Sequence, residues 1–197
     1  MPDFIAVLIR PRATMRRILD QRRYRWIPLV VLAVLASSIH DIKPREFLHV
    51  IPAEQTWMIV GIIAAVICAG LAICLLLFYG LSWITYFVGR TFDGTGEVRE
   101  VRAATAWGLM PLILSAVYRV PLAFWLASQL VSINPMACGT MAIVGAAEIL
   151  TLVWYAMTAS ACLAEAHRFS FLRGLATLAF TWLTPLILTL AAVLSLT

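Results

Sequence analysis

The sequence has little charge and is dominated by apolar residues. Only 13% of its 197 residues are Asp, Glu, Lys or Arg, whereas 62% are hydrophobic. With a mean hydropathy of +0.93, the chain carries more apolar surface than a soluble domain of this length can enclose in its own core. A soluble globular protein is therefore excluded, and lipid must be part of the solvent around the chain.

The few histidines and cysteines form no recognisable catalytic or metal-binding pattern. His40, His49 and His167 are far apart, and no Ser-His-Asp, HExxH or paired-carboxylate arrangement lies on one helix face. The four cysteines include no CxxC pair and have no neighbouring histidine, so they are expected to be buried small hydrophobes. We expect no enzymatic activity, no catalytic residue, no cofactor and no bound metal.

A polar segment at 89–97 contains three glycines but does not match a phosphate-binding loop. No strand precedes it, and neither a third glycine of the nucleotide fingerprint nor a GK[ST] sequence follows. We expect Gly89, Gly94 and Gly96 to form a hinge between two apolar helices, with Gly94 and Gly96 supplying turn conformations and Thr95 capping the second helix. A solvated loop is one interpretation of this hinge, and a docking site for a cytosolic partner is the other.

The apolar sequence divides into five stretches that are candidates for crossing a membrane. A crossing needs about 20 mainly apolar residues, and the first stretch is slightly short. The second stretch is expected to be one long helix, whereas Pro111 and Pro121 should kink or break the third. The chain 1–197 is then one domain, an all-α polytopic membrane bundle of five transmembrane helices. Its expected spans are 24–39, 56–88, 103–125, 141–164 and 171–194.

The basic residues define an orientation for these five crossings. Twelve of the fifteen Lys and Arg residues lie in three polar segments that five crossings would place on one side of the membrane. Basic residues near span ends are retained on the cytoplasmic side, so the N-terminus is expected inside and the C-terminus outside. The twelve residues are Arg10, Arg12, Arg16, Arg17, Arg22, Arg23, Arg25, Arg90, Arg99, Arg102, Arg168 and Arg173.

An N-terminal arm, residues 1–23, precedes the first span and has helical periodicity. Apolar residues recur at intervals of three and four, which predicts an amphipathic helix in the membrane interface, broken near Pro11. The stripe consists of Phe4, Leu8, Pro11, Met15 and Ile18. The whole chain has a net charge of +5, and its basic arm is expected to meet anionic lipid head groups rather than nucleic acid. The expected head-group contacts are Arg10, Arg12, Arg16, Arg17, Arg22 and Arg23. Alternatively, the arm only anchors the first span.

Arg119 and Glu148 are the only charged residues that these boundaries place inside the hydrocarbon region. An ionisable group costs about 2.5 to 3.5 kcal/mol there on insertion scales, so each is a candidate functional residue. Their expected depths allow an ion pair that fixes helix register, and an ion or proton site is the alternative.

Small residues at every fourth position mark one side of the second span. Gly61, Ala65 and Ala69 form a ridge that lets another helix approach closely. The partner helix belongs either to the same bundle or to another copy or protein.

Three segments together resemble the Yip1 family of small polytopic membrane proteins. They are Phe4 with Arg10-Pro11-Arg12-Ala13-Thr14-Met15-Arg16-Arg17-Ile18-Leu19, Gly89-Arg90-Thr91-Phe92-Asp93-Gly94-Thr95-Gly96, and Ala106-Trp107-Gly108-Leu109-Met110-Pro111. Eukaryotic members of this family are linked to vesicle trafficking and bind Rab GTPases, whereas bacterial members are compact inner-membrane proteins. The chain resembles the bacterial type because it lacks a long cytosolic N-terminal domain and the Asp-Leu-Tyr-Gly-Pro motif of eukaryotic relatives.

These patterns support three hypotheses about function. The first is a non-enzymatic protein of the bacterial inner membrane that organises lipid or a partner protein at the cytoplasmic face, with a membrane-protein partner or a second copy bound to it. The second is a small channel or transporter that uses Glu148 and Arg119. The third is an accessory subunit of a larger membrane complex.

Overall fold

A computed structural model of the chain describes residues 3–22, 27–38, 56–129 and 136–196. Within these ranges every regular element is an α-helix and no strand is present, as the sequence predicted. The helices are α1 (Asp3–Ile9), α2 (Pro11–Asp20), α3 (Ile27–Ser38), α5 (Thr56–Thr91), α6 (Val98–Gly108), α7 (Met110–Gln129), α8 (Met136–His167) and α9 (Phe171–Leu196).

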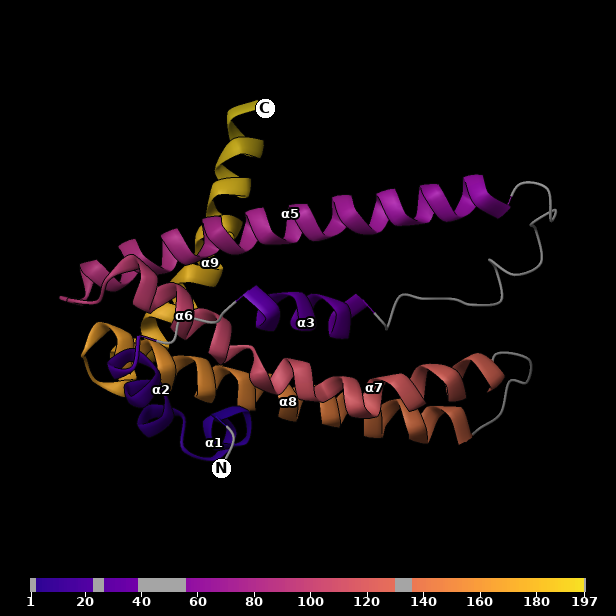
Figure 1. Cartoon of the computed structure of the whole chain (residues 1–197), viewed down its shortest axis with the longest axis horizontal. Coiled ribbons are helices and arrows are strands. Elements are labelled where there is room, and N and C mark those ends of the chain that lie inside the picture. Colours follow the sequence, from indigo (N-terminus) through magenta and orange to yellow (C-terminus); the bar gives the residue numbers. More distant parts are fainter. Residues whose placement is uncertain (1–2, 23–26, 39–55, 130–135, 197) are drawn as a thin grey trace.

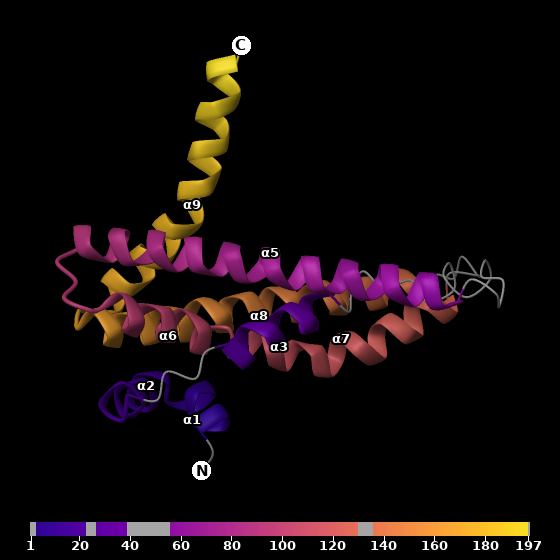
Figure 2. The same ribbon diagram turned by 45° about the horizontal axis from the view of Figure 1, so that its top comes forward.

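The helices form an elongated bundle with one divergent helix. Helices α3, α5, α7 and α8 run along the long axis, and α6 leads into α7 (Figures 1 and 2). Helix α9 begins against α8 and α5, but its C-terminal part leaves the bundle at a steep angle. Helices α1 and α2 pack near the start of α9, on the opposite side of the bundle from its C-terminal end. One end of the molecule therefore gathers α2, α6 and the α8–α9 turn.

Three helical segments are long and apolar enough to cross a membrane. They are Ile67–Thr91, Val98–Arg119 and Ala142–His167, and Phe171–Ile187 is a shorter apolar helix. Helix α3 has 12 residues, about 18 Å of helix, which is short of a hydrocarbon core of about 30 Å. These apolar helices indicate a membrane-associated protein. Five crossings with the N-terminus inside stay a prediction, and residues 40–55 and 130–135, which lie between predicted spans, are outside the described residues.

The prolines affect the helices as their backbone chemistry predicts. The first helix ends at Ile9 and the second begins at Pro11, because the proline ring fits a first helical turn and lacks the donor needed further along. The predicted third span breaks at Leu109, two residues before Pro111, whereas Pro121 lies inside α7. The predicted second span is one continuous helix of 36 residues, α5.

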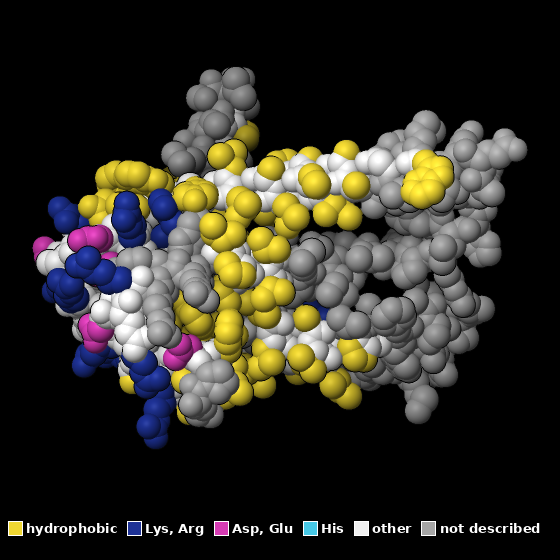
Figure 3. Space-filling view, in the orientation of Figure 1, with side chains coloured by type: hydrophobic (Ala, Val, Ile, Leu, Met, Phe, Trp, Pro, Cys, Tyr) yellow, Lys and Arg dark blue, Asp and Glu magenta, His cyan; other side chains and the backbone are white. Residues whose placement is uncertain are grey.

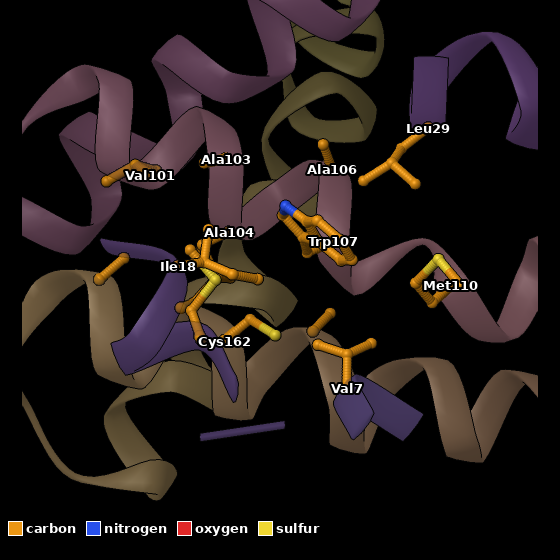
Figure 4. Close-up of a cluster of buried hydrophobic side chains, with 14 of the residues drawn as sticks. Val7, Ile18, Leu29, Val101, Ala103, Ala104, Ala106, Trp107, Met110 and Cys162 are labelled. Atoms are coloured by element: carbon orange, nitrogen blue, oxygen red, sulfur yellow. The ribbon is translucent and has the colours of Figure 1, made fainter. Parts of the chain in front are cut away.

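A compact hydrophobic core joins α1 and α2 to the bundle. Val7 and Met15 are fully buried, and Ile18 is 2% exposed, beside Trp107 of α6 and Cys162 of α8 (Figure 4). The N-terminal stripe was expected to lie in the lipid interface, but its Met15 and Ile18 pack inside the protein. Periodicity identifies the apolar side of a helix without identifying what covers it, so this part of the stripe was assigned to the wrong environment.

Small residues on α8 allow two other helices to approach closely. A Cβ added at Gly108 of α6 would lie 2.9 Å from the Ala159 Cα atom. A Cβ at Gly174 of α9 would collide with the Ser160 carbonyl oxygen and approach the Ala164 side chain. Helix α8 is therefore the central packing element, contacted by α6 on one side and α9 on another.

Candidate functional site: the arginine-rich end of the bundle

A polar hollow of about 790 Å³ lies at the end of the bundle where α2, α6 and the α8–α9 turn meet. We call it the arginine hollow, and Lys and Arg side chains gather over this end, apart from the hydrophobic middle (Figure 3). Five arginines and four carboxylates line it, so its net charge is positive. Its lining residues are Arg12, Arg16, Leu19, Asp20, Arg22, Glu97, Arg99, Glu100, Ala164, Glu165, Arg168 and Phe169.

Glu165 near the end of α8 anchors α2 over this hollow. Its Oε1 atom lies 2.5 Å from Arg16 Nε, and its Oε2 atom lies 3.4 Å from Arg12 Nε. Glu165 is only 11% exposed, so the two arginines compensate a carboxylate that is largely withdrawn from water. The hydrogen bond to Glu165, followed by the charge of Glu165, raises the pKa of Arg16. Two predicted head-group contacts, Arg12 and Arg16, thus serve first to attach α2.

The remaining arginines around this end differ in whether they form an ion pair with a carboxylate. Arg168 lies 3.7 Å from Glu100, and Arg17 lies 3.6 Å from Asp3, both at exposed positions. Arg22 and Arg99 line the hollow and have no ion-pair partner among the residues that the structure describes. Arg23, another predicted head-group contact, lies outside the described residues. Arg22 and Arg99 are therefore the arginines of the hollow that no ion pair holds, and they share it with the carboxylates of Asp20 and Glu97.

The hinge at 89–97 is packed tightly around His167 rather than solvated. Gly89, Gly94 and Gly96 are all buried. A Cβ at Gly89 or Gly94 would overlap the imidazole ring of His167, and a Cβ at Gly96 would overlap the Ala166 carbonyl group. The backbone N–H of Thr95 donates to the His167 carbonyl oxygen at 3.1 Å. The solvated-loop interpretation is therefore wrong for these glycines.

Two further expectations for the hinge are corrected by its backbone. No glycine in the described residues has a positive φ, and the left-handed residue of this turn is Asp93, with φ of 64°. Helix α6 is capped by Glu97 rather than Thr95, and the Glu97 backbone N–H donates to Glu100 Oε2 at 2.9 Å. Gly89 and Gly94 are thus required because the ring of His167 occupies the space of a side chain, and Gly96 because the Ala166 carbonyl group does.

His167 is the most deeply enclosed polar side chain at this end. It is 0% exposed, and its ring stacks on Phe169 with a centroid separation of 5.1 Å and an interplanar angle of 3°. Neither ring nitrogen has a hydrogen-bond partner in the part of the chain that the structure describes. Burying such groups costs free energy, so the fit of the ring between the glycines and Phe169 must offset that cost.

Arg119 and Glu148 are brought together by the contact between α7 and α8. Arg119 Nε donates to Glu148 Oε1 at 2.9 Å, and Arg119 Nη2 donates to Glu148 Oε2. Their side chains are 17% and 29% exposed. One turn away, the Tyr118 hydroxyl lies 3.1 Å from the Thr151 hydroxyl. The bidentate pair therefore cross-links α7 and α8, and its depth in a membrane stays a prediction.

The comparison with known families agrees with this geometry. The Yip1 domain matches residues 5–193, nearly the whole chain. The chain belongs to the Yip1 family. No curated protein and no solved structure matches it.

The segments that resemble Yip1 sequences converge on the C-terminal part of α8. The corner at Pro11 places Arg12 near Glu165, the glycine hinge surrounds His167, and Gly108 fits against Ala159. Short motifs that are distant in the sequence are therefore parts of one packed unit. Being a Yip1-family protein with apolar helices, the chain is a membrane protein.

Two residues at this centre were missed by the sequence analysis. Glu165 lay at the edge of a predicted span, and His167 was regarded as an isolated histidine. The only available signal was the group of glycines at 89, 94 and 96, because closely spaced glycines indicate either special backbone angles or close approach of another group. No group of three or more potential metal ligands occurs among the described residues.

Among the residues that the structure describes, no helix packs against the small-residue ridge on α5. Gly61, Ala65 and Ala69 are exposed, and no heavy atom lies within 4 Å of a Cβ built at Gly61. Cys68 on the same helix is exposed as well, so the expectation of a buried cysteine is wrong there, whereas Cys162 is buried. Packing of this ridge within the bundle is not observed. A contact with another copy or another protein stays a hypothesis.

Proposed function

We propose that this Yip1-family chain is a non-enzymatic, multi-pass protein of the bacterial inner membrane that organises anionic lipid or an acidic partner protein at its cytoplasmic face. The observation that carries this proposal is the arginine hollow. It is built from three separate parts of the chain, has an excess of positive charge, and contains two arginines outside ion pairs, Arg22 and Arg99. Clustered arginines near a membrane surface attract anionic groups, and guanidinium groups bind carboxylate or phosphate with paired hydrogen bonds.

The position of the hollow supports a cytoplasmic role. Positive residues are retained on the cytoplasmic side. The hollow contains arginines from all three basic segments of the sequence. The ion pairs of Glu165 and the packing around His167 fix this end before any ligand binds. A fixed site loses less conformational entropy on binding than a flexible one.

Native mass spectrometry of the full chain, purified in a mild detergent, tests this proposal. The wild-type chain is expected to retain lipid or a partner protein. The double variant Arg22→Gln/Arg99→Gln is expected to lose most of this ligand. A matched control, Arg17→Gln/Arg90→Gln, removes the same charge outside the hollow and should retain the ligand. A wild-type monomer without lipid or partner, or equal retention by both double variants, would contradict the proposal.

The channel or transporter hypothesis has narrower support, from the Arg119–Glu148 pair alone. Several buried hydroxyl groups in the bundle donate to carbonyl groups of their own helices, including Ser82 to Phe78 and Thr181 to Thr177. Such hydroxyls are less available to line a polar pathway. Flux through reconstituted wild-type protein that is lost in Glu148→Gln would favour transport.

An accessory role in a larger membrane complex shares the surface of the first proposal. Affinity purification at native expression would separate the two. A fixed ratio of one partner to this chain, lost in Arg22→Gln/Arg99→Gln, would favour the accessory role over a lipid-organising one.

A further inference from the structure

A second hollow, of about 490 Å³, opens between the corner of α1 and α2 and the side of α8. We call it the corner groove. Leu8 lies on the N-terminal side of it and Trp154 and Met157 on the α8 side, and Phe171 at the start of α9 also lines it. The groove has the volume of sites that hold small organic ligands.

The floor of the corner groove is apolar and faces outward. Met157 is 52% exposed and Trp154 is 38% exposed, and both belong to the membrane-crossing candidate Ala142–His167. The indole N–H of Trp154 donates to the Leu8 carbonyl oxygen at 3.4 Å, which holds the two sides of the groove together. Large apolar side chains on a segment of this kind are covered by acyl chains rather than by water.

Two arginines are the only charged residues in the lining. Arg10 is the residue between α1 and α2, and it has no ion-pair partner in the ranges that the structure describes. Arg12 contacts Glu165 at 3.4 Å but is 49% exposed. Arginine is well suited to phosphate because its planar guanidinium group donates paired hydrogen bonds. Positive charge therefore lies directly beside an apolar floor.

We propose that the corner groove binds one anionic phospholipid, with its phosphate at Arg10 and Arg12 and an acyl chain along Leu8, Trp154 and Met157. This proposal rests on the proposed lipid role and identifies the class of lipid and the place where it binds. A free phosphate ion would use the arginines but leave the apolar floor uncovered. A phospholipid matches both parts of the groove, and their order, phosphate toward the arginine-rich end, is that of a lipid in the cytoplasmic leaflet.

The test measures lipid binding to the full chain in a mild detergent by native mass spectrometry. Phosphatidylglycerol, phosphatidylcholine with the same acyl chains, and inorganic phosphate are titrated separately. Phosphatidylglycerol is expected to bind most tightly and inorganic phosphate not to bind. Equal affinity for the two lipids would overturn the proposal, because the arginines would then contribute nothing to recognition.

Two variants locate the bound lipid. Arg10→Gln leaves both ion pairs of Glu165 intact. It should weaken the binding of phosphatidylglycerol about fivefold, as expected for the loss of one basic residue beside an anionic lipid. Ala13→Trp places an indole in the groove from an exposed position on α2, and should block both lipids without disturbing the core. Arg17 was also predicted as a head-group contact, but it pairs with Asp3 at 3.6 Å and lies outside the groove. The control Arg17→Gln therefore removes the same charge from α2 and should bind lipid at the groove like the wild type.

The outcomes separate this proposal from the wider one. Unchanged phosphatidylglycerol binding in Arg10→Gln and Ala13→Trp overturns the corner groove as the site. The proposed function survives that result if a ligand is still lost in Arg22→Gln/Arg99→Gln. Loss of a copurifying protein, instead of lipid, in Ala13→Trp would also overturn the phospholipid proposal. A wild-type chain that retains neither lipid nor partner contradicts both.

Discussion

Glu165 accepts a hydrogen bond from Arg16 across 149 positions of the sequence, with 2.5 Å between Nε and Oε1. This contact joins the N-terminal arm to the C-terminal end of α8. Because of this contact, α2, which resembles a peripheral membrane anchor in sequence, lines the arginine hollow.

Glu165→Gln is expected to loosen α2 from the bundle. The substitution leaves Arg12 and Arg16 without their shared counter-charge, while Met15 and Ile18 still hold the apolar side of the helix. We expect trypsin to cleave α2 faster than in the wild type, with the other helices protected as before. Asp3→Asn, which removes only the exposed contact with Arg17, is the matched control and should leave the cleavage rate unchanged. Equal rates for Glu165→Gln and the wild type would show that apolar packing alone attaches α2.

Gly89→Ala is expected to destabilise the fold by about 1 to 3 kcal/mol, the usual cost of overpacking. The added methyl group would occupy the space of the His167 ring. In the double variant Gly89→Ala/His167→Ala the ring is absent, so the cost of the methyl group should largely disappear. Thermal melting in detergent of the wild type, the two single variants and the double variant measures the coupling free energy between Gly89 and His167.

Gly61→Ala is the control for this cycle. Nothing lies within 4 Å of its Cβ position, so a gain of about 0.5 to 1 kcal/mol from helix propensity is expected instead of a loss. Similar losses for Gly61→Ala and Gly89→Ala would contradict the close fit between the hinge and His167.

Arg168→Gly is expected to stabilise the α8–α9 turn. Arg168 has φ of 59°, and the backbone N–H of Phe169 donates to the Ala164 carbonyl oxygen at 3.0 Å, the helix-ending pattern that favours glycine. Left-handed geometry costs a non-glycine residue about 1 kcal/mol, whereas the 3.7 Å contact with Glu100 comes from an Arg168 side chain that is 68% exposed and contributes little. The melting temperature should follow the order Gly above Arg, with Ala no higher than Arg. A lower value for Gly than for Ala would refute the argument from backbone geometry.

Glu148→Gln is expected to lower stability more than removal of both charges. The single substitution leaves the Arg119 guanidinium largely enclosed without its carboxylate, which costs about 2 kcal/mol for a partly exposed pair. In Arg119→Met/Glu148→Met no charge remains, and the loss should be smaller. Melting in detergent ranks the variants, and additive losses from Arg119→Met and Glu148→Met would show that the two side chains do not depend on each other.

Reporter fusions test the predicted orientation. Five crossings with the N-terminus inside place a C-terminal alkaline phosphatase outside, where it is active, and leave a C-terminal fluorescent protein dark. A fusion truncated in the hinge, after Gly96, should give the opposite pair of signals. Fluorescence from the full-length fusion would mean an even number of crossings.

The sequence predicted local structure well because local rules control it. The break at Pro11 and the single long helix α5 follow from proline chemistry and apolar length. The approach of Arg119 to Glu148 was anticipated from helical rise alone, since both lie near the same end of neighbouring helices.

Packing between residues far apart in the sequence could not be predicted from such local rules. The assignment of Met15 and Ile18 to lipid was wrong because a helical stripe does not distinguish lipid from protein as its covering. Gly94 and Gly96 were attributed to turn conformations because the groups that fill the space of their side chains, His167 and the Ala166 carbonyl, are about 70 positions away in the sequence. Glu165 could be recognised only after α2 had been placed beside α8.

The length of α5 has a consequence for the membrane itself. The apolar part Ile67–Thr91 alone has 25 residues, about 37 Å of helix, which exceeds a hydrocarbon thickness of about 30 Å. Such a hydrophobic mismatch is relieved by tilting the helix or by thickening the bilayer locally. Because the end of α5 contacts the end of α8 through the hinge, we expect a tilt of α5 to act on the α8–α9 turn. Bilayer thickness would then influence the shape of the arginine-rich end.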